Sequence, residues 1–370
     1  MSDRIKKLSS VGQSVWCDNL SRRMLDSGEL QRLIDLGVVG VTSNPTIFMK
    51  AITGSDDYDG LFQRVLDAGE TDVMTIYERL VMPDVAGAAD ILRPVYDRTD
   101  GLDGYVSLEV NPKLAFDTEA TVVEARRLFA ELNRPNVLIK VPGTDEGIPA
   151  IETLISEGIS VNVTLIFSLA MYERVMDAYV NGLRLRHKNG GDLHRVASVA
   201  SFFVSRVDSL VDKLLDEKGG DALACKGQAA VANAKKAYAR FEEVFDEAGD
   251  FGPLARAGAR VQRPLWASTS TKNPEYPDTL YVDALIGPNT VNTMPPATLE
   301  ATLDHGASEV SITCGVDEAR EVLEKIDRLG VDMVAVTDQL LREGVAMFAD
   351  SFDELLANLT AKQEQLRAVG

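Results

Sequence analysis

A lysine lies inside an apolar run of the sequence, in the segment "VLIKVP" at residues 137–142. The apolar residues on both sides of Lys140 predict a strand that is buried on both faces. Such surroundings disfavour the ammonium form of a lysine, and a neutral amine can attack a carbonyl group to form a Schiff base. The segment therefore predicts imine chemistry at Lys140.

Carbon–carbon cleavage next to an imine also needs groups that move protons. A protonated imine withdraws electrons from the adjacent carbon, so cleavage there leaves an enamine. A base must take the proton of the substrate hydroxyl, and an acid–base group must shuttle protons while the imine forms. Asp18 and Glu109, which lie in other strand-like segments, are the available carboxylates.

Histidine and cysteine give no pattern of a metal site or a disulfide framework. The three cysteines are odd in number and far apart, which predicts reduced thiols. The histidines lie outside the strand-like segments, and we expect them at the surface: His187, His194 and His305. We therefore expect neither a metal nor another cofactor.

Composition limits the partners of the chain. Its 370 residues are 45% hydrophobic and 26% charged, which is typical of a globular protein with a large core. The net charge of −19 disfavours nucleic acid and anionic membranes as partners, so an anionic substrate needs a local basic pocket. The sequence contains neither a transmembrane segment nor a signal peptide, which predicts a cytoplasmic protein.

Short apolar segments alternate with longer amphipathic ones along most of the chain. This alternation predicts parallel strands joined by right-handed helical crossovers, and the number of strands favours a (β/α)₈ TIM barrel over an open sheet. The eight predicted strands are residues 14–18, 38–44, 105–110, 137–142, 160–166, 196–204, 263–269 and 279–287.

Additional helices are expected around the barrel. One helical insertion covers residues 71–97, and C-terminal helices follow after about residue 290, at 317–330 and 351–369. Residues 331–336 resemble a ninth strand, but their position favours a connector. Asp117 with Thr118, and Ser168, mark two helix starts. No linker divides the chain, so we expect residues 1–370 to form one domain.

Polar side chains gather at the predicted C-terminal strand ends, where such barrels place their working residues. Each has an ordinary explanation when taken alone: Asn44 precedes a proline and fits a turn, and Glu109 fits an ion pair with Lys140. Their convergence on one end of one barrel favours a functional site. The set comprises Asp18, Asn44, Glu109, Lys140, Asn162, Thr164, Ser201, Arg206 and Ser268.

Five motifs resemble those of transaldolases, particularly the longer bacterial branch. They are "VTSNPTIF", "VSLEVNPKLAFD", "VLIKVPGTDEGI", "SVNVTLIFS" and "LWASTSTKNP", and the resemblance covers about residues 14–287. It implies a Schiff-base barrel enzyme of the pentose phosphate pathway. Such an enzyme moves a dihydroxyacetone unit from sedoheptulose 7-phosphate to glyceraldehyde 3-phosphate and yields erythrose 4-phosphate and fructose 6-phosphate.

The resemblance also implies a role for each matching residue. Lys140 matches the Schiff-base lysine, and Asp18 matches the base of carbon–carbon cleavage. Glu109 and Thr164 match the pair that positions a water molecule. The residues that match substrate contacts are Asn44 and Asn162 for the dihydroxyacetone hydroxyls, Ser201 for a further contact, and Arg206 and Ser268 for the phosphate.

The chain departs from the shorter transaldolases after Ser268. Those enzymes place an arginine soon after that serine, whereas this chain has "TSTK" and offers Lys272 instead. No phosphoglucose isomerase domain, as some fused relatives carry, fits in the length. The resemblance leaves open whether the protein is a monomer or a homodimer.

Two other functions remain open. A fructose 6-phosphate aldolase-like lyase would release dihydroxyacetone to water, but the apolar ring of Phe203 would exclude a hydrolytic water and favours transfer. An ordinary place in the barrel core explains Phe203 equally well. A non-catalytic sugar-phosphate binding barrel would not need Lys140 with two carboxylates, and no nucleotide-binding glycine motif follows any predicted strand.

Overall fold

Eight parallel strands form a closed barrel, which confirms the predicted fold class. The computed structural model describes residues 3–369. The strands neighbour each other in chain order, and β1 pairs with β8 to close the barrel. Their bounds are β1 Gln13–Cys17, β2 Gly40–Thr42, β3 Tyr105–Glu109, β4 Val137–Pro142, β5 Val161–Ile166, β6 Ser198–Phe203, β7 Arg263–Ala267 and β8 Thr290–Met294.

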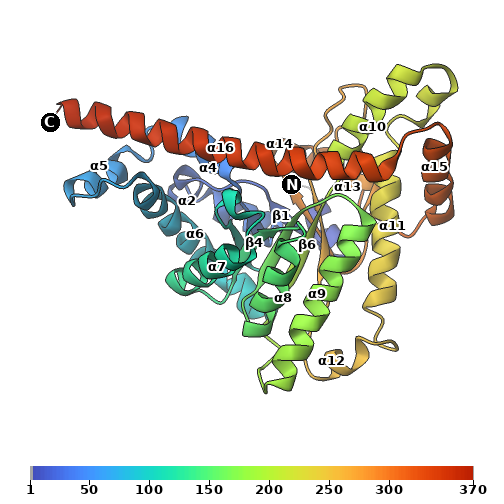
Figure 1. Ribbon diagram of the computed structural model, residues 1–370, viewed down its shortest axis with the longest axis horizontal. Helices are drawn as coiled ribbons and strands as arrows, with labels where there is room; N and C mark the ends of the chain where they lie inside the picture. Colours follow the sequence, from blue (N-terminus) through green and yellow to red (C-terminus); the bar gives the residue numbers. More distant parts are fainter. Residues whose placement is uncertain (1–2, 370) are drawn as a thin grey trace.

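Helices follow the strands and surround the barrel, as Figure 1 shows for α8, α9 and α11. The longer helices up to β7 are α1 Arg4–Ser10, α3 Glu29–Leu36, α4 Pro45–Thr53, α5 Asp59–Asp67, α6 Val73–Arg98, α7 Thr118–Leu132, α8 Gly147–Glu157, α9 Leu169–Lys188, α10 Ser205–Lys218 and α11 Ala229–Val244. Those after β8 are α14 Pro296–His305, α15 Val316–Arg328 and α16 Met333–Val369. Short helices are α2 Arg22–Asp26, α12 Gly252–Arg256 and α13 Leu280–Ala284, with 3₁₀ turns η1 Pro112–Leu114 and η2 Gly220–Cys225.

Both predicted helix starts are confirmed. The side chain of Asp117 accepts a hydrogen bond from the backbone N–H of Ala120 at the start of α7. Ser168 does the same for Met171 at the start of α9. Each side chain satisfies a backbone donor that the first helical turn leaves without a partner.

The prediction of the eighth strand at residues 279–287 is wrong. That segment forms α13, and β8 follows at Thr290–Met294. Most apolar residues of the segment, Tyr281, Val282, Leu285 and Ile286, are buried as helix and turn residues. β8 was not predicted because some of its buried side chains are polar. These side chains have partners elsewhere in the barrel: Gln13 donates to the hydroxyl of Thr290, and Thr269 donates to the carbonyl oxygen of the Asn292 side chain.

The C-terminal part is one long helix rather than a connector followed by a helix. α16 begins at Met333, so residues 331–336 are neither a strand nor mainly a connector. Its 37 residues correspond to about 55 Å at the rise of an α-helix. Figure 1 shows α16 running from the neighbourhood of α10 and α15 across the molecule and past α4 toward α5. It also contacts α6 and the end of β5.

The predicted helical insertion at residues 71–97 corresponds to α6, a single helix that leads directly into β3. The apolar side chains of the strands and helices form one continuous core. The single-domain organisation stays a prediction, which this shared core supports. Among helices of the described residues, none is sufficiently long and apolar to cross a membrane.

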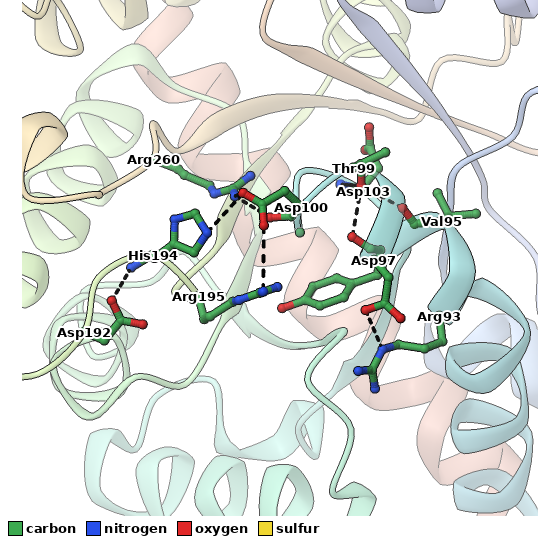
Figure 2. A network of polar contacts seen from close by, with 12 residues as sticks. Arg93, Val95, Asp97, Thr99, Asp100, Asp103, Asp192, His194, Arg195 and Arg260 are labelled. Atoms are coloured by element: carbon green, nitrogen blue, oxygen red, sulfur yellow. Dashed lines mark hydrogen bonds and ion pairs between the residues drawn. The ribbon is translucent and has the colours of Figure 1, made fainter.

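The N-terminal end of the barrel is held by polar contacts. The buried guanidinium of Arg263 donates to Asp103 at 2.9 Å and to Ser14 at 2.8 Å, and Asp103 also accepts from Trp16. Figure 2 shows a second, exposed cluster nearby, in which Asp100 faces a histidine and two arginines from the segments before β6 and β7: His194, Arg195 and Arg260. These contacts tie together loops at the end opposite Lys140.

Candidate active site

A cleft of about 630 Å³ opens at the C-terminal end of the barrel. Nine of the predicted site residues line it, although they come from six different strands or the segments that follow them. They are Asp18, Asn44, Lys140, Thr164, Ser201, Phe203, Arg206, Ser268 and Lys272. Glu109 and Asn162 lie beside Lys140 in neighbouring strands but do not line the cleft.

The register of the barrel aligns three of the predicted residues. Glu109 on β3 is paired with Lys140 on β4, and Lys140 is paired with Asn162 on β5. Because paired residues of a parallel barrel occupy the same level, their side chains project inward close together. The strand pattern thus places an amine between a carboxylate and an amide.

The amine of Lys140 contacts two polar groups. Its Nζ donates to the carbonyl oxygen of Ser43 at 3.0 Å and lies 3.2 Å from Oε2 of Glu109. The residue is only 5% exposed, yet it lines the cleft. A substrate carbonyl in the cleft can therefore reach the amine while most of the side chain stays out of water.

Burial raises the pKa of Glu109, and the nearby charge of Asp18 raises it further. The charge and hydrogen-bonding capacity of Lys140 oppose this shift. Oε2 of Glu109 faces the Lys140 amine, whereas Oε1 of Glu109 and the hydroxyl of Thr164 are buried without a hydrogen-bond partner among the described residues. Buried polar atoms of this kind are commonly satisfied by ordered water. The geometry therefore suits a pair that holds a water molecule near the amine.

Asp18 stands directly after β1, with one carboxylate oxygen held in place. Thr42 on β2 donates to Oδ1 of Asp18 at 2.7 Å, and the Thr42 and Thr293 hydroxyls are 2.5 Å apart. Burial raises the pKa of Asp18, while the Thr42 hydrogen bond and the charges of Lys140 and Lys272 oppose the rise. A carboxylate with a raised pKa is suited to accept a proton and return it.

The two predicted amides differ in their surroundings. Asn162 is fully buried, donates to the hydroxyl of Ser107 at 3.0 Å and accepts from Ser201 at 2.7 Å. Asn44 uses its side-chain oxygen to cap α4, accepting from the N–H of Ile47. The turn explanation for Asn44 therefore holds, and the residue also lines the cleft.

Cations that form no ion pair with a carboxylate among the described residues gather on one side of the cleft. Burial lowers the pKa of Arg206, and burial together with the charges of Arg206 and Lys50 lowers the pKa of Lys272. Asp208 and Asp212, the acids of α10 near Arg206, bond instead to backbone N–H groups and to tyrosines. Although the charges of Glu343 and Asp18 act on Arg206 and Lys272, a group of cations without ion pairs in a protein of net charge −19 indicates an anion site.

The loop after β7 brings Ser268 and Lys272 toward Arg206. The hydroxyl of Ser268 lies 2.9 Å from that of Ser205, and Lys272 donates to Ser270 at 2.7 Å. Ser268 has a φ of 56°, a strained conformation for a residue other than glycine. Leu165, which follows Thr164, has a φ of 60° beside a register shift between β5 and β6. Ser268 lines the cleft, and Leu165 adjoins Thr164, which also lines it.

Sequence reasoning missed several cleft residues, above all Lys50 and Phe348. Lys50 lies six residues after Asn44, in the last turn of α4. A basic residue inside this apolar helix could have indicated a place in the cleft. The ring of Phe348 lies 5.8 Å from the Lys140 amine, but nothing in the pattern of α16 indicated which apolar residue would reach the barrel mouth. Thr42 was also missed, although it lies two residues before Asn44.

Within the part of the chain that the structure describes, no cluster of three or more potential metal ligands occurs. His194 and His305 lie at the exposed surface, where each contacts aspartate side chains. The three cysteines carry free thiols.

Comparison with known proteins gives consistent matches. A family model described as Transaldolase/Fructose-6-phosphate aldolase matches residues 15–359. The chain is 52% identical over 369 residues to a protein of Acidothermus cellulolyticus named Transaldolase, with 99% of each chain covered. A Thermobifida fusca protein named Transaldolase is 52% identical over 359 residues, covering 96% of this chain and 97% of the relative. A Nostoc protein named Transaldolase 2 is 46% identical, with 99% of each covered.

Proposed function

Since the chain belongs to the Transaldolase/Fructose-6-phosphate aldolase family, we propose that it is a transaldolase acting through Lys140. It takes a dihydroxyacetone unit from sedoheptulose 7-phosphate and gives it to glyceraldehyde 3-phosphate. The products are erythrose 4-phosphate and fructose 6-phosphate. The observation that carries the proposal is the buried amine of Lys140, 3.2 Å from Glu109 at the base of a cleft that also holds Asp18.

The reaction follows from the positions of these groups. The amine attacks the ketose carbonyl, and water leaves as the imine forms, with Glu109 and Thr164 holding that water. Asp18 accepts the proton of the hydroxyl on the carbon beyond the bond that breaks. The electrons of that bond move to the protonated imine, which becomes an enamine while the first aldose departs. The second aldose accepts the same carbon unit, and the steps reverse.

The remaining cleft residues bind the substrates. Asn44, Asn162 and Ser201 hold the hydroxyls of the dihydroxyacetone unit, Asn162 being close to Lys140 through the strand register. The phosphate lies between α10 and the loop after β7, where it contacts the side chains of Arg206, Ser268 and Lys272. This places the carbonyl end of the sugar near the amine.

Reduction with borohydride in the presence of fructose 6-phosphate tests the proposal. The imine is reducible whereas the free amine is not, so the intact protein should gain the mass of one reduced dihydroxyacetone unit, and peptide mapping should find it on Lys140. An unmodified protein, or a label on another lysine, would overturn the mechanism. The Lys140→Ala variant should fold, gain no mass on reduction and show no turnover.

Two features favour transfer over the lyase alternative of the same family. The full-length relatives are named transaldolases, and Phe203 presents an apolar ring to the cleft. The complete set of Lys140, Asp18 and Glu109 also argues against a barrel that only binds sugar phosphates. We propose that the protein acts in the cytoplasm on phosphorylated sugars. It is a monomer or a homodimer, and it requires no metal.

A further inference from the structure

The helix α16 brings an aromatic ring to the reacting amine from outside the barrel. Phe348 lies in the middle of α16 and is 4% exposed, and its ring centroid is 5.8 Å from Nζ of Lys140. Phe348 and Met347 are the α16 residues that line the cleft. The amine therefore has Glu109 and Ser43 as polar partners and an apolar ring on another side.

The height of Phe348 above the amine is fixed by close packing one turn earlier. A side chain at Gly344 would lie 3.0 Å from Cδ2 of Leu165 and near the ring of Phe167. Gly344 thus lets α16 approach the end of β5, at the strained residue that follows Thr164. A helix held this closely keeps the Phe348 ring in place instead of letting it swing out.

A second ring borders the same cleft from the barrel side. Phe203 is 6% exposed, packs at 5.2 Å against Phe167, and lies under the guanidinium of Arg206 at 5.3 Å. Phe167 therefore contacts Phe203 and lies close to the Gly344 turn of α16. The apolar wall is continuous from β6 to α16.

We propose that Phe348 is a specificity-determining residue that keeps water from the enamine at Lys140 and so directs it to transfer. This inference rests on the proposed transaldolase function. Loss of the enamine to water requires a proton on its carbon, addition of water to the imine carbon and cleavage of the carbon–nitrogen bond. The products are free dihydroxyacetone and the Lys140 amine, with no oxidant or reductant. A ring beside the amine occupies space through which that water would enter.

The test supplies fructose 6-phosphate with no acceptor. In the wild type, glyceraldehyde 3-phosphate should appear as a burst of about one equivalent per site, followed by slow release, because each enamine waits for an aldose. Phe348→Ala should turn the slow phase into steady turnover and raise the ratio of hydrolysis to transfer by about tenfold or more. Phe348→Leu retains apolar bulk and should show a smaller rise in a protein that folds more readily.

Leu355→Ala provides the matched control. Leu355 lies two turns further along α16, is fully buried and does not line the cleft, so its loss loosens the same helix without opening the amine. It should keep the wild-type ratio. Equal ratios in both Phe348 variants and the wild type, or equal increases in Phe348→Ala and Leu355→Ala, would overturn the inference. A wild type that cannot transfer the unit when acceptor is added would instead refute the proposed function.

Discussion

Lys140 and Glu109 are direct partners in the register of β4 and β3, and the ion pair between them, at 3.2 Å, is almost completely buried. A buried pair of this kind adds little to stability, because removing both charges from water costs about as much as their attraction returns. A role in proton transfer explains the position of this pair beside the cleft better than a role in stability does. The carboxylate can take and return protons while the amine changes from an ammonium to an imine.

Replacing Glu109 tests this explanation. Glu109→Gln keeps the size of the side chain but removes its capacity to shuttle protons, so imine formation should slow by about 10²- to 10⁴-fold. The measurement is the rate at which borohydride traps dihydroxyacetone on Lys140. Glu119→Gln, at an exposed position of α7, is the control and should trap at the wild-type rate. Unchanged trapping in Glu109→Gln would remove Glu109 from the mechanism.

Thr42 should set the acid limb of the pH profile. Asp18 must be ionised to accept the hydroxyl proton, so kcat should fall as the pH drops through its raised pKa. Thr42→Val removes the hydrogen bond that lowers this pKa, and the acid limb should move to higher pH. Thr293→Val leaves that hydrogen bond intact and should leave the limb near its wild-type position. A limb that stays fixed in Thr42→Val would indicate that another group controls it.

The anion site predicts a selective loss of affinity. Arg206→Ala should raise KM for fructose 6-phosphate by about 10- to 200-fold, as expected for losing roughly 1.5 to 3 kcal/mol of charge-assisted hydrogen bonding. Lys272→Ala and Lys50→Met should have smaller effects, because lysine lacks the two-pronged fork of arginine. Steady-state kinetics with fructose as an unphosphorylated donor should change much less in all three.

Lys213→Met, at an exposed position of α10, controls for loss of a positive charge. It should leave KM for both donors unchanged. Equal losses for phosphorylated and unphosphorylated donors in Arg206→Ala would show that Arg206 supports the fold or the imine instead.

The buried contacts at the opposite end of the barrel should matter for stability alone. Arg263→Met leaves the buried carboxylate of Asp103 without its cation, and the free energy of unfolding should fall by about 3 to 5 kcal/mol. Asp100→Asn disrupts the exposed cluster of Figure 2, where solvent screens the charges, and should cost far less. Urea denaturation measures both. A larger loss in Asp100→Asn would mean that the exposed cluster, not Arg263, holds this end together.

Asp84 should make stability depend on pH in an unusual direction. It is buried in α6, where Tyr58 donates to it at 2.6 Å and Arg22 pairs with it, and burial still raises its pKa to about 6. Because the folded-state pKa is raised, its stabilising contribution is complete below about pH 4 and is lost as the pH rises through about 6.

Comparison with a variant isolates that contribution. Asp84→Asn cannot ionise, so between pH 5 and 7 the free energy of unfolding of the wild type should change relative to the variant. The wild type should lose stability with rising pH by at most about 1.4 kcal/mol per pH unit more than Asp84→Asn. Parallel denaturation curves across this range would show that Asp84 keeps an ordinary pKa in the fold.

Most of the barrel was predictable because its strands are short, apolar and buried on both faces. Seven of the eight predicted strands overlap observed ones. β8 was not predictable in this way because Thr290 and Asn292 are buried polar residues that accept hydrogen bonds from side chains in β1 and after β7. The apolar sequence of α13 fits the pattern of a buried strand better than the partly polar sequence of β8 does.

Site residues at the ends of strands could be predicted from the sequence. Site residues that reach the cleft through tertiary packing could not. Lys140 lies beside Glu109 and Asn162 because of the strand register. The position of each residue within its predicted strand gives this register approximately. Phe348 belongs to a helix about 200 residues further along the chain, whose rotation and seating are set by contacts such as that of Gly344 with Leu165. Local patterns carry no information about such seating.

The position of α16 has a consequence for the order in which the protein matures during synthesis. A ribosome releases all eight strands, including the β1–β8 pair that closes the barrel, before residues 333–369 emerge. Chains generally begin to fold from their N-terminal parts while translation continues. A nascent barrel thus passes through a stage in which Lys140 is already buried between its neighbours but the ring of Phe348 has not yet arrived. The helix that brings this ring to the amine is therefore translated after every strand of the barrel.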